Sequence, residues 1–177
     1  KKTYPAIHNH LSHWEDKLVK RDDQGKCWWE LRSCAYYQEF EQPKIVIPAI
    51  TNDVEYAADY AKYLSNDKTS ICVTGEPNYL LGLLNSKALW WFIRQTAANK
   101  QGGFYEFKPM YVSALPIPTA SPAQQKAVAG LVEQILAAKK RDPKADVAEW
   151  EREIDKLVYA LYDLSKDEIK LVEGQTK

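Results

Sequence analysis

The sequence predicts an α+β fold: a small mixed or antiparallel sheet packed on a buried helix, followed by a C-terminal helical hairpin. Short β-branched runs in the first half predict the strands, and a long apolar run at residues 78–93 predicts the helix. After Ser121 apolar residues recur at helical spacing, which predicts the hairpin. The 177 residues, 45% of them hydrophobic, are enough for a packed core. We expect two parts, residues 1–120 and residues 121–177.

The first half contains one predicted helix and two predicted strands. Apolar side chains in residues 5–20 are spaced by three and four, as on one side of a helix. They are Leu11, Trp14 and Leu18. Residues 44–50 and 70–74 are rich in β-branched side chains and are bounded by proline or glycine, which is typical of short strands.

The run that starts at Asn78 is predicted to be a core helix, because its apolar side chains surround nearly the whole helix circumference. The segment 99–107 contains two adjacent glycines and is expected to be a loop. Residues 111–118 are expected to be extended, because their two prolines fix φ and exclude a helix.

The last third predicts a helical hairpin and a short final helix. The first stripe has spacings of three and four and stops at the turn 141–143. It consists of Val128, Leu131, Val132, Ile135 and Leu136. The second stripe alternates the same spacings, as in packed helix pairs. It consists of Val147, Trp150, Ile154, Leu157, Leu161 and Leu164. Ser165 and Glu168 have capping-box spacing, so a last helix is expected to begin there.

Charge and composition limit the class of protein. The 24 basic and 24 acidic side chains cancel, so bulk electrostatics does not favour DNA binding. Residues 85–110, however, carry four basic side chains against one acidic, which predicts a small basic face. The sequence has no run that could span a bilayer and no secretory signal, and we expect no membrane partner and a cytoplasmic location. Because no initiator methionine is present, we expect a piece of a longer parent chain.

The sequence contains no recognisable motif for catalysis or for cofactor binding. The sequence contains no Gly-x-Gly-x-x-Gly or phosphate-loop pattern, and its three cysteines form no Cys-x-x-Cys pair. A helix would point His8 and His10 about 200° apart, so a zinc site with His13 is disfavoured. We therefore expect no catalytic residue, no metal and no cofactor in this chain.

Several motifs, in this order and spacing, carry a resemblance to a known family. They are Trp28-Trp29-Glu30-Leu31-Arg32, Pro43-Lys44-Ile45-Val46-Ile47-Pro48, Asn85-Ser86-Lys87 after an apolar helix, Leu115-Pro116-Ile117-Pro118, and Glu153-Ile154-Asp155-Lys156-Leu157-Val158-Tyr159. The chain resembles the TaqI-like C-terminal specificity domain of adenine-specific DNA methyltransferases and fused methyltransferase–endonucleases of restriction–modification systems. The resemblance implies a non-catalytic module that recognises double-stranded DNA, and a parent chain whose catalytic domain binds S-adenosylmethionine (SAM).

Side-chain chemistry indicates which residues are candidates for DNA contact. Arg and Lys pair with guanine or phosphate, Asn and Gln pair with adenine, and residues 94–103 are rich in these groups. A guanidinium beside two indoles is the second candidate, although core burial is the favoured explanation for the indoles themselves. The candidates are Trp28, Trp29, Arg32, Lys44, Lys87, Arg94, Gln95, Asn99, Lys100, Gln101 and Lys108.

A function of another class stays open at this point. The helical hairpin is a possible protein–protein interaction surface, and the neutral net charge fits that alternative. In either case we expect the hairpin to pack against the parent's catalytic domain or a partner.

Overall fold

The computed structural model describes residues 2–174, in two compact units. The first ends at Gln38 and the second begins at Glu39. In the first unit, α1 (Pro5–Ser12) and α2 (Glu15–Leu18) replace the single helix expected over residues 5–20. At the break, the N–H groups of His13 and Trp14 donate to carbonyls three residues back. The His13 ring also lies 2.9 Å from the Asn9 carbonyl, so its side chain competes for the helical acceptors.

The second unit begins with a three-stranded antiparallel sheet. The 3₁₀ helix η1 (Tyr37–Glu41) leads into β1 (Lys44–Pro48), which lies between β3 (Ala57–Asp59) and β4 (Thr69–Val73). β1 and β4 confirm the two strands expected from the β-branched runs. Ile45 and Ile47 of β1 are buried, which fixes the face that the sheet turns to the core.

A second small sheet occupies the region where we expected a loop. It has the order β2 (Ile50–Thr51), β6 (Phe104–Glu106), β5 (Asn99–Lys100), and both pairs are antiparallel. The prediction of a loop over residues 99–107 was therefore wrong. Gly102 and Gly103, at φ of 81° and 79°, make the turn between β5 and β6, a conformation that other residues adopt at a cost.

The predicted core helix consists of two helices, α3 (Pro77–Leu84) and α4 (Lys87–Thr96). They are separated at Asn85 and Ser86, whose side chains bond to backbone groups. The Ser86 hydroxyl accepts a hydrogen bond from the Leu89 N–H and so caps α4. Because the chain changes direction here, side chains that would surround one straight helix point into two parts of the core.

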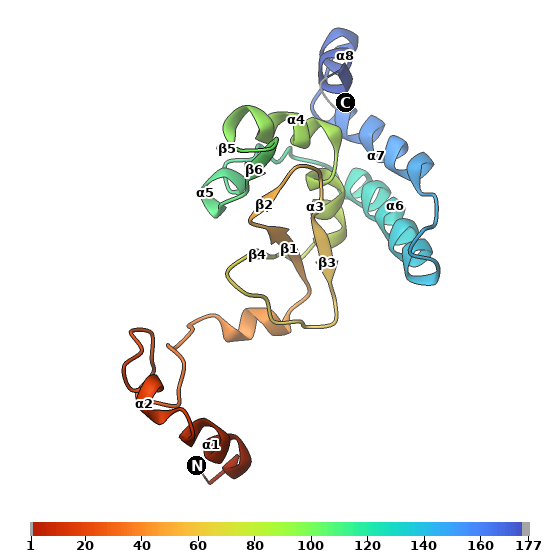
Figure 1. Cartoon of the computed structure of the whole chain (residues 1–177). Coiled ribbons are helices and arrows are strands. Elements are labelled where there is room, and N and C mark those ends of the chain that lie inside the picture. The colour runs from red at the N-terminus through yellow and green to blue at the C-terminus, as the bar shows by residue number, and fades with distance from the viewer. Residues whose placement is uncertain (1, 175–177) are drawn as a thin grey trace. The chain divides into compact units, whose positions relative to one another are not determined.

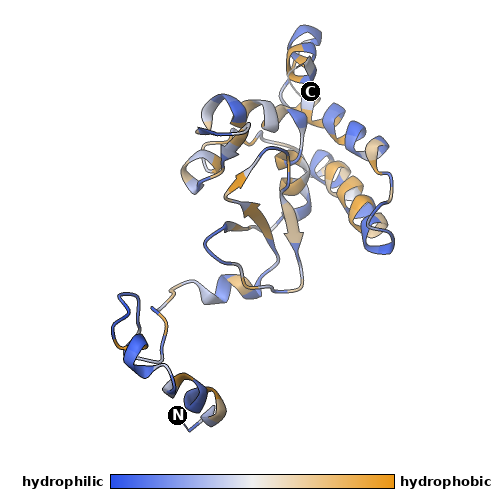
Figure 2. Cartoon of the chain, viewed as in Figure 1, coloured by the Kyte–Doolittle hydropathy of each residue, from blue (hydrophilic) through white to orange (hydrophobic). Residues whose placement is uncertain are grey.

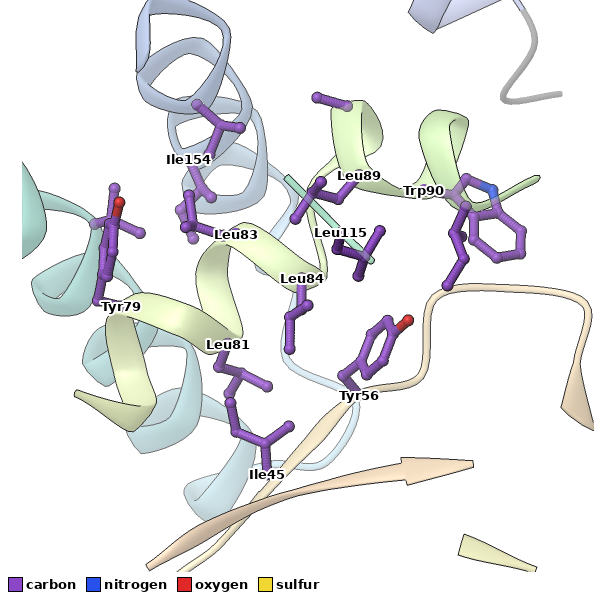
Figure 3. Close-up of a cluster of buried hydrophobic side chains, with 14 of the residues drawn as sticks. Ile45, Tyr56, Tyr79, Leu81, Leu83, Leu84, Leu89, Trp90, Leu115 and Ile154 are labelled. Carbon is purple, nitrogen blue, oxygen red and sulfur yellow. The ribbon is translucent and has the colours of Figure 1, made fainter. Parts of the chain in front are cut away.

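The core lies around α3, as Figure 3 shows. Leu81 points toward Ile45 of β1, and Leu83 points toward Ile154 of the C-terminal helices. α3 contacts both the first sheet and the hairpin, and Figure 1 shows it between them. One buried cluster thus joins the sheet and the helices, and α3 is its centre.

After the last strand and before the helical hairpin, the chain forms a short helix that we did not expect. α5 (Pro109–Val112) begins with a proline, whose fixed φ suits the first turn of a helix. The expectation of an extended segment over residues 111–118 was therefore wrong for its first residues. Pro116 lies outside any helix, and its carbonyl accepts a hydrogen bond from the Tyr162 hydroxyl.

The predicted hairpin and final helix are confirmed. They comprise α6 (Pro122–Arg141), α7 (Ala148–Leu161) and α8 (Lys166–Gly174). Ser165 and Glu168 form the expected capping box, and Ser121 with Gln124 forms another. Figure 2 shows hydrophobic and hydrophilic residues alternating along α6 and α7. None of the helices within residues 2–174 has the length and apolar character needed to cross a bilayer.

The hairpin shares its core with the sheet. Val128 and Val132 of α6 and Ile154 and Val158 of α7 belong to the same buried cluster as the strand residues. The second compact unit accordingly includes both. The division between residues 1–120 and 121–177 remains a prediction. The first part is expected to recognise DNA, and the second is expected to be a helical hairpin that packs against the parent chain or a partner.

Two glycines give opposite expectations for stability. A Cβ at Gly82 of α3 would lie 2.5 Å from Cγ1 of Val128, so Gly82→Ala forces α3 and α6 apart. We expect it to lower the free energy of unfolding by about 1–3 kcal/mol. A Cβ at Gly130 of α6 meets no atom within 4 Å, so Gly130→Ala is expected to add about 0.5–1 kcal/mol. Urea denaturation measures both, and equal effects would contradict this packing.

Candidate nucleic-acid interface

The outer face of the β2-β6-β5 sheet is defined by strand register. Lys100 pairs with Phe104, and Ile50 pairs with Glu106. Directly opposed residues of an antiparallel pair point to the same face, and residues two apart do so along one strand. Lys100, Phe104, Glu106 and Ile50 therefore share one face, and Lys108 follows two residues after Glu106. Phe104 is 37% exposed and Ile50 53%, so this face is turned to solvent.

The opposite face of the same sheet packs on the core. Thr51 pairs with Tyr105, and Thr51 is only 3% exposed. The Tyr105 ring contacts Trp90 edge to face, with centroids 5.8 Å apart, and Trp90 stacks on Phe107 at 6.0 Å. These aromatic contacts hold the sheet against α4 and leave its other side free of core contacts.

Two lysines and one carboxylate form the charged centre of the outer face. The Lys108 ammonium lies 3.1 Å from Oε1 of Glu106, and the Lys100 ammonium lies 3.5 Å from Oε2. The hydrogen bond from Lys108 is the main reason that the pKa of Glu106 lies below its usual value, and the charge of Lys100 adds to the effect. The cluster therefore carries a net charge of about +1 at neutral pH.

Asn99 in β5 and Gln101 in the turn are also exposed, but Asn99 pairs with Tyr105 and so points to the opposite face of the sheet from Lys100. Two further candidates lie at the end of α4, which leads directly into β5. The Arg94 guanidinium lies over the Trp90 ring, 5.7 Å from its centroid, and the Gln95 amide donates to the Trp91 carbonyl. The structure thus brings Asn99, Lys100, Gln101 and Lys108 together on or beside one hairpin.

Lys87 has a different position, at the start of α4. Its backbone N–H donates to Oδ1 of Asp155 over 2.9 Å. Its ammonium lies 3.8 Å from Asp155 and 3.9 Å from Glu173, so two carboxylates offset its charge. Burial is the main reason that the pKa of Asp155 is raised, and the hydrogen bond from Lys87 opposes that rise. Lys87 therefore connects α4 to α7 and α8.

Lys44 is buried, and its placement in a DNA surface was wrong. Its side chain is 0% exposed, and its ammonium lies 2.5 Å from Asp59 and 2.9 Å from the Phe40 carbonyl. Burial opposes the ionisation of Asp59, but hydrogen bonds from Lys44 and from the N–H groups of Ala61 and Tyr63 lower its pKa. Asp59 faces Lys44 across the β1–β3 pair, a relation that the sequence alone does not reveal.

A comparison with known protein families decides the class. The model of the TaqI-like C-terminal specificity domain matches residues 3–117 of the chain. The chain belongs to this family. Among curated proteins, none matches it. A TaqI-like specificity domain recognises specific DNA sequences in restriction–modification systems and is itself non-catalytic. The matched range contains the β5–β6 hairpin and every candidate contact residue, and it stops before α6.

The remaining candidates of this specificity domain lie in its first unit. Trp28 and Trp29 meet edge to face at 5.2 Å, and the His8 ring lies 5.6 Å and 5.1 Å from them. Both indoles are half-buried, so they form the centre of this small unit. Arg32 is exposed, and its guanidinium lies 3.5 Å from exposed Asp23.

Two observations concern residues outside the candidate set. Glu106 was not among the sequence candidates, although its position two residues from Phe104 and from Lys108 is the signal that places it on their face. Within residues 2–174, the specificity domain has no group of three or more His, Cys, Asp or Glu side chains placed to hold a metal ion.

The carboxylate that caps α4 in this specificity domain gives a test of stability. Asp155→Ala removes the acceptor for the Lys87 N–H and is expected to cost about 1–2 kcal/mol of unfolding free energy. Asp155→Asn keeps an acceptor and is the matched control, expected to lose much less.

The raised pKa of Asp155 adds a pH dependence to this pair. The folded state binds this proton more tightly than the unfolded state, so the contribution of Asp155 falls as pH rises from about 3.8 through its folded pKa. Asp155→Asn lacks this titration and should gain stability relative to wild type between pH 4 and pH 7. Thermal melts across that range measure the difference, and a gain in the opposite direction would contradict the assignment.

Proposed function

We propose that this chain is the target-recognition part of an adenine-specific DNA methyltransferase, alone or fused to an endonuclease, and that the β5–β6 hairpin enters the major groove of the target. Family membership supplies recognition of DNA. The observation that carries the finer proposal is the solvent-facing hairpin, on which Lys100 and Lys108 flank Glu106 on one face, Gln101 lies in the turn and Asn99 is exposed on the opposite face.

The shape of this element suits the groove. The major groove of B-DNA admits a two-stranded β-ribbon, and there each base pair shows a distinct pattern of donors and acceptors. An Asn or Gln amide pairs with adenine, and a Lys ammonium pairs with guanine, so Asn99, Gln101 and Lys100 have the chemistry for base contact. Lys108 lies where the strand leaves the sheet and is the proposed phosphate contact.

The adjacent aromatic side chain completes the surface. Phe104 follows the glycine turn and is 37% exposed on the face that carries Lys100. A ring in this position offers apolar contact to a thymine methyl group or to a sugar. The hairpin thus combines cations, amides and one ring within a few residues.

The parent chain would supply the reaction. Methylation of an adenine requires the base to leave the stack, and the catalytic domain of the parent would hold both SAM and the extruded base. This chain then decides where the reaction occurs. Further phosphate contacts from the catalytic domain fit the neutral net charge found here.

One cavity favours a second function, in which a protein partner docks on the helical hairpin formed by α6 and α7. It has a volume of about 550 Å³ and an apolar floor that includes Leu81 of α3 and Ile135 of α6. Three carboxylates, those of Asp53, Glu151 and Asp155, line it together with one cation, Lys87, which offsets part of their charge. The excess of carboxylates repels phosphate, so this surface suits the parent's catalytic domain or another protein with a basic side chain, and not DNA.

Replacement of the two hairpin lysines tests the DNA-contact surface. Lys100→Glu with Lys108→Glu is expected to weaken binding to the chain's preferred duplex at least about tenfold at 50 mM salt. The slope of log affinity against log salt should fall by about 1–2, since about 0.9 is lost for each phosphate contact. Fluorescence anisotropy with a labelled duplex measures both quantities.

The matched control changes the net charge equally at another place. Lys126→Glu with Lys140→Glu alters two exposed lysines of α6 and should leave the affinity and the salt slope close to wild type. If both pairs weaken binding equally, bulk charge and not the hairpin is responsible. If wild type does not bind duplex DNA at 50 mM salt, the proposed function is wrong and the docking function is favoured.

A further inference from the structure

We propose that Glu106 is a specificity-determining residue of the DNA-contact surface: its carboxylate, held between Lys100 and Lys108, suppresses binding to DNA of arbitrary sequence. This inference rests on the proposed function and assigns a role to a residue that has the same sign of charge as its ligand. Such a carboxylate needs an explanation, because an acidic group at the centre of a DNA surface reduces attraction to every phosphate.

The geometry makes Glu106 part of a fixed unit with both cations. Each carboxylate oxygen faces a different lysine, Oε1 facing Lys108 and Oε2 facing Lys100. The Glu106 side chain is 14% exposed, whereas those of Lys100 and Lys108 are 43% and 58% exposed. The carboxylate therefore lies beneath two ammonium groups that reach further into solvent.

The carboxylate stays charged under working conditions. The pKa of Glu106 is lowered, chiefly by the hydrogen bond from Lys108, so the group is ionised at neutral pH. The three side chains then carry about +1 together, where the two lysines alone would carry +2. A passing phosphate meets a weaker field, and the cluster neutralises less phosphate charge, so fewer of the counterions condensed on the DNA are released.

A correctly placed base still finds donors on these lysines. An ammonium has three N–H donors, and Glu106 occupies one direction at each lysine. The remaining donors are held in a defined direction, because the carboxylate restricts both long side chains. Discrimination increases when DNA of the wrong sequence is penalised more than the target sequence. The Glu106 carboxylate, which is mostly buried beneath the two lysines, imposes such a penalty because it has the same sign of charge as the phosphates.

The same residue contributes little to the fold, so the role can be tested without unfolding the protein. Its ion pairs involve exposed lysines, and such pairs add little to stability. β6 is instead held by pairing to β2 and β5 and by Tyr105 and Phe107, which contact Trp90. Glu106→Gln keeps the shape of the side chain and removes only the charge.

The experiment compares two DNA probes across a salt series. One is a duplex enriched from a random pool by the wild-type chain, and the other is the random pool itself. Glu106→Gln is expected to bind the random pool about 3- to 10-fold more tightly at 50 mM salt, with a salt slope steeper by up to about 0.9. The ratio of affinities for the enriched duplex and the pool should fall.

Two controls make the outcome specific to this cluster. Glu149→Gln removes one negative charge from an exposed position of α7 and should leave both affinities nearly unchanged. Glu106→Gln combined with Lys100→Gln restores the net charge of the cluster and should return binding of the random pool close to the wild-type level. Circular dichroism confirms that each variant is folded.

The possible results separate this inference from the proposed function. If the two-lysine variant loses binding but Glu106→Gln binds the random pool no more tightly than wild type, the inference is overturned and the function stands. An equal gain for Glu149→Gln also overturns it. If wild type binds neither probe, the proposed function is wrong and this inference is overturned with it.

Discussion

The turn at Asn85 and Ser86, between α3 and α4, is the constraint on which the rest of the second unit depends. The Asn85 amide exchanges two hydrogen bonds with the backbone of Tyr56, at 3.2 and 3.0 Å, as a neighbouring strand would. Ser86 and Asp155 each accept an N–H of the first turn of α4. This turn therefore connects α3 and α4 to the segment that precedes β3 and to α7. Each bond contributes about 1 kcal/mol, but an unpaired buried group costs more, so the turn fixes the direction of α4. That direction sets the place of the β5–β6 hairpin, because α4 ends three residues before β5 begins.

Ion pairs explain how a domain without net charge presents a basic surface. The sequence places four basic side chains in residues 85–110, but they are not equivalent in the fold. Carboxylates of α7 and α8 offset Lys87, and Arg94 lies over an indole ring. Lys100 and Lys108 remain on the outer face of the sheet and share Glu106. Of these four cations, Lys100 and Lys108 thus place their charge on the outer face of one sheet, an arrangement that favours a few directed contacts over general attraction.

The sequence predicts those features that depend on neighbours in the chain. Strands β1 and β4, the α6–α7 hairpin and the capping box at Ser165 follow from local spacing, and the structure confirms them. The break at Asn85 depends on Tyr56, 29 residues away, and the burial of Lys44 depends on Asp59 in another strand. No local pattern reveals either. Two adjacent glycines fit a hairpin as well as a loop, so only the paired strands decide between them. For the proposed DNA surface, side-chain chemistry selects a region of the chain, but which of its cations are offset depends on residues of distant helices.

The motifs that carry the family resemblance do not overlap the β5–β6 hairpin proposed to contact DNA, and this explains what a resemblance can reveal. Asn85 and Ser86 hold the turn, Leu115 is buried in the core, and the Pro116 carbonyl binds Tyr162. These positions support the scaffold, and the same scaffold suits any target sequence. The β5–β6 hairpin has no side chain in the core on its outer face, so the residues there can change without loss of the fold. The residues that pack such a module therefore show which family it belongs to. Its DNA target depends instead on a few exposed side chains, and packing places no restriction on which residues these are.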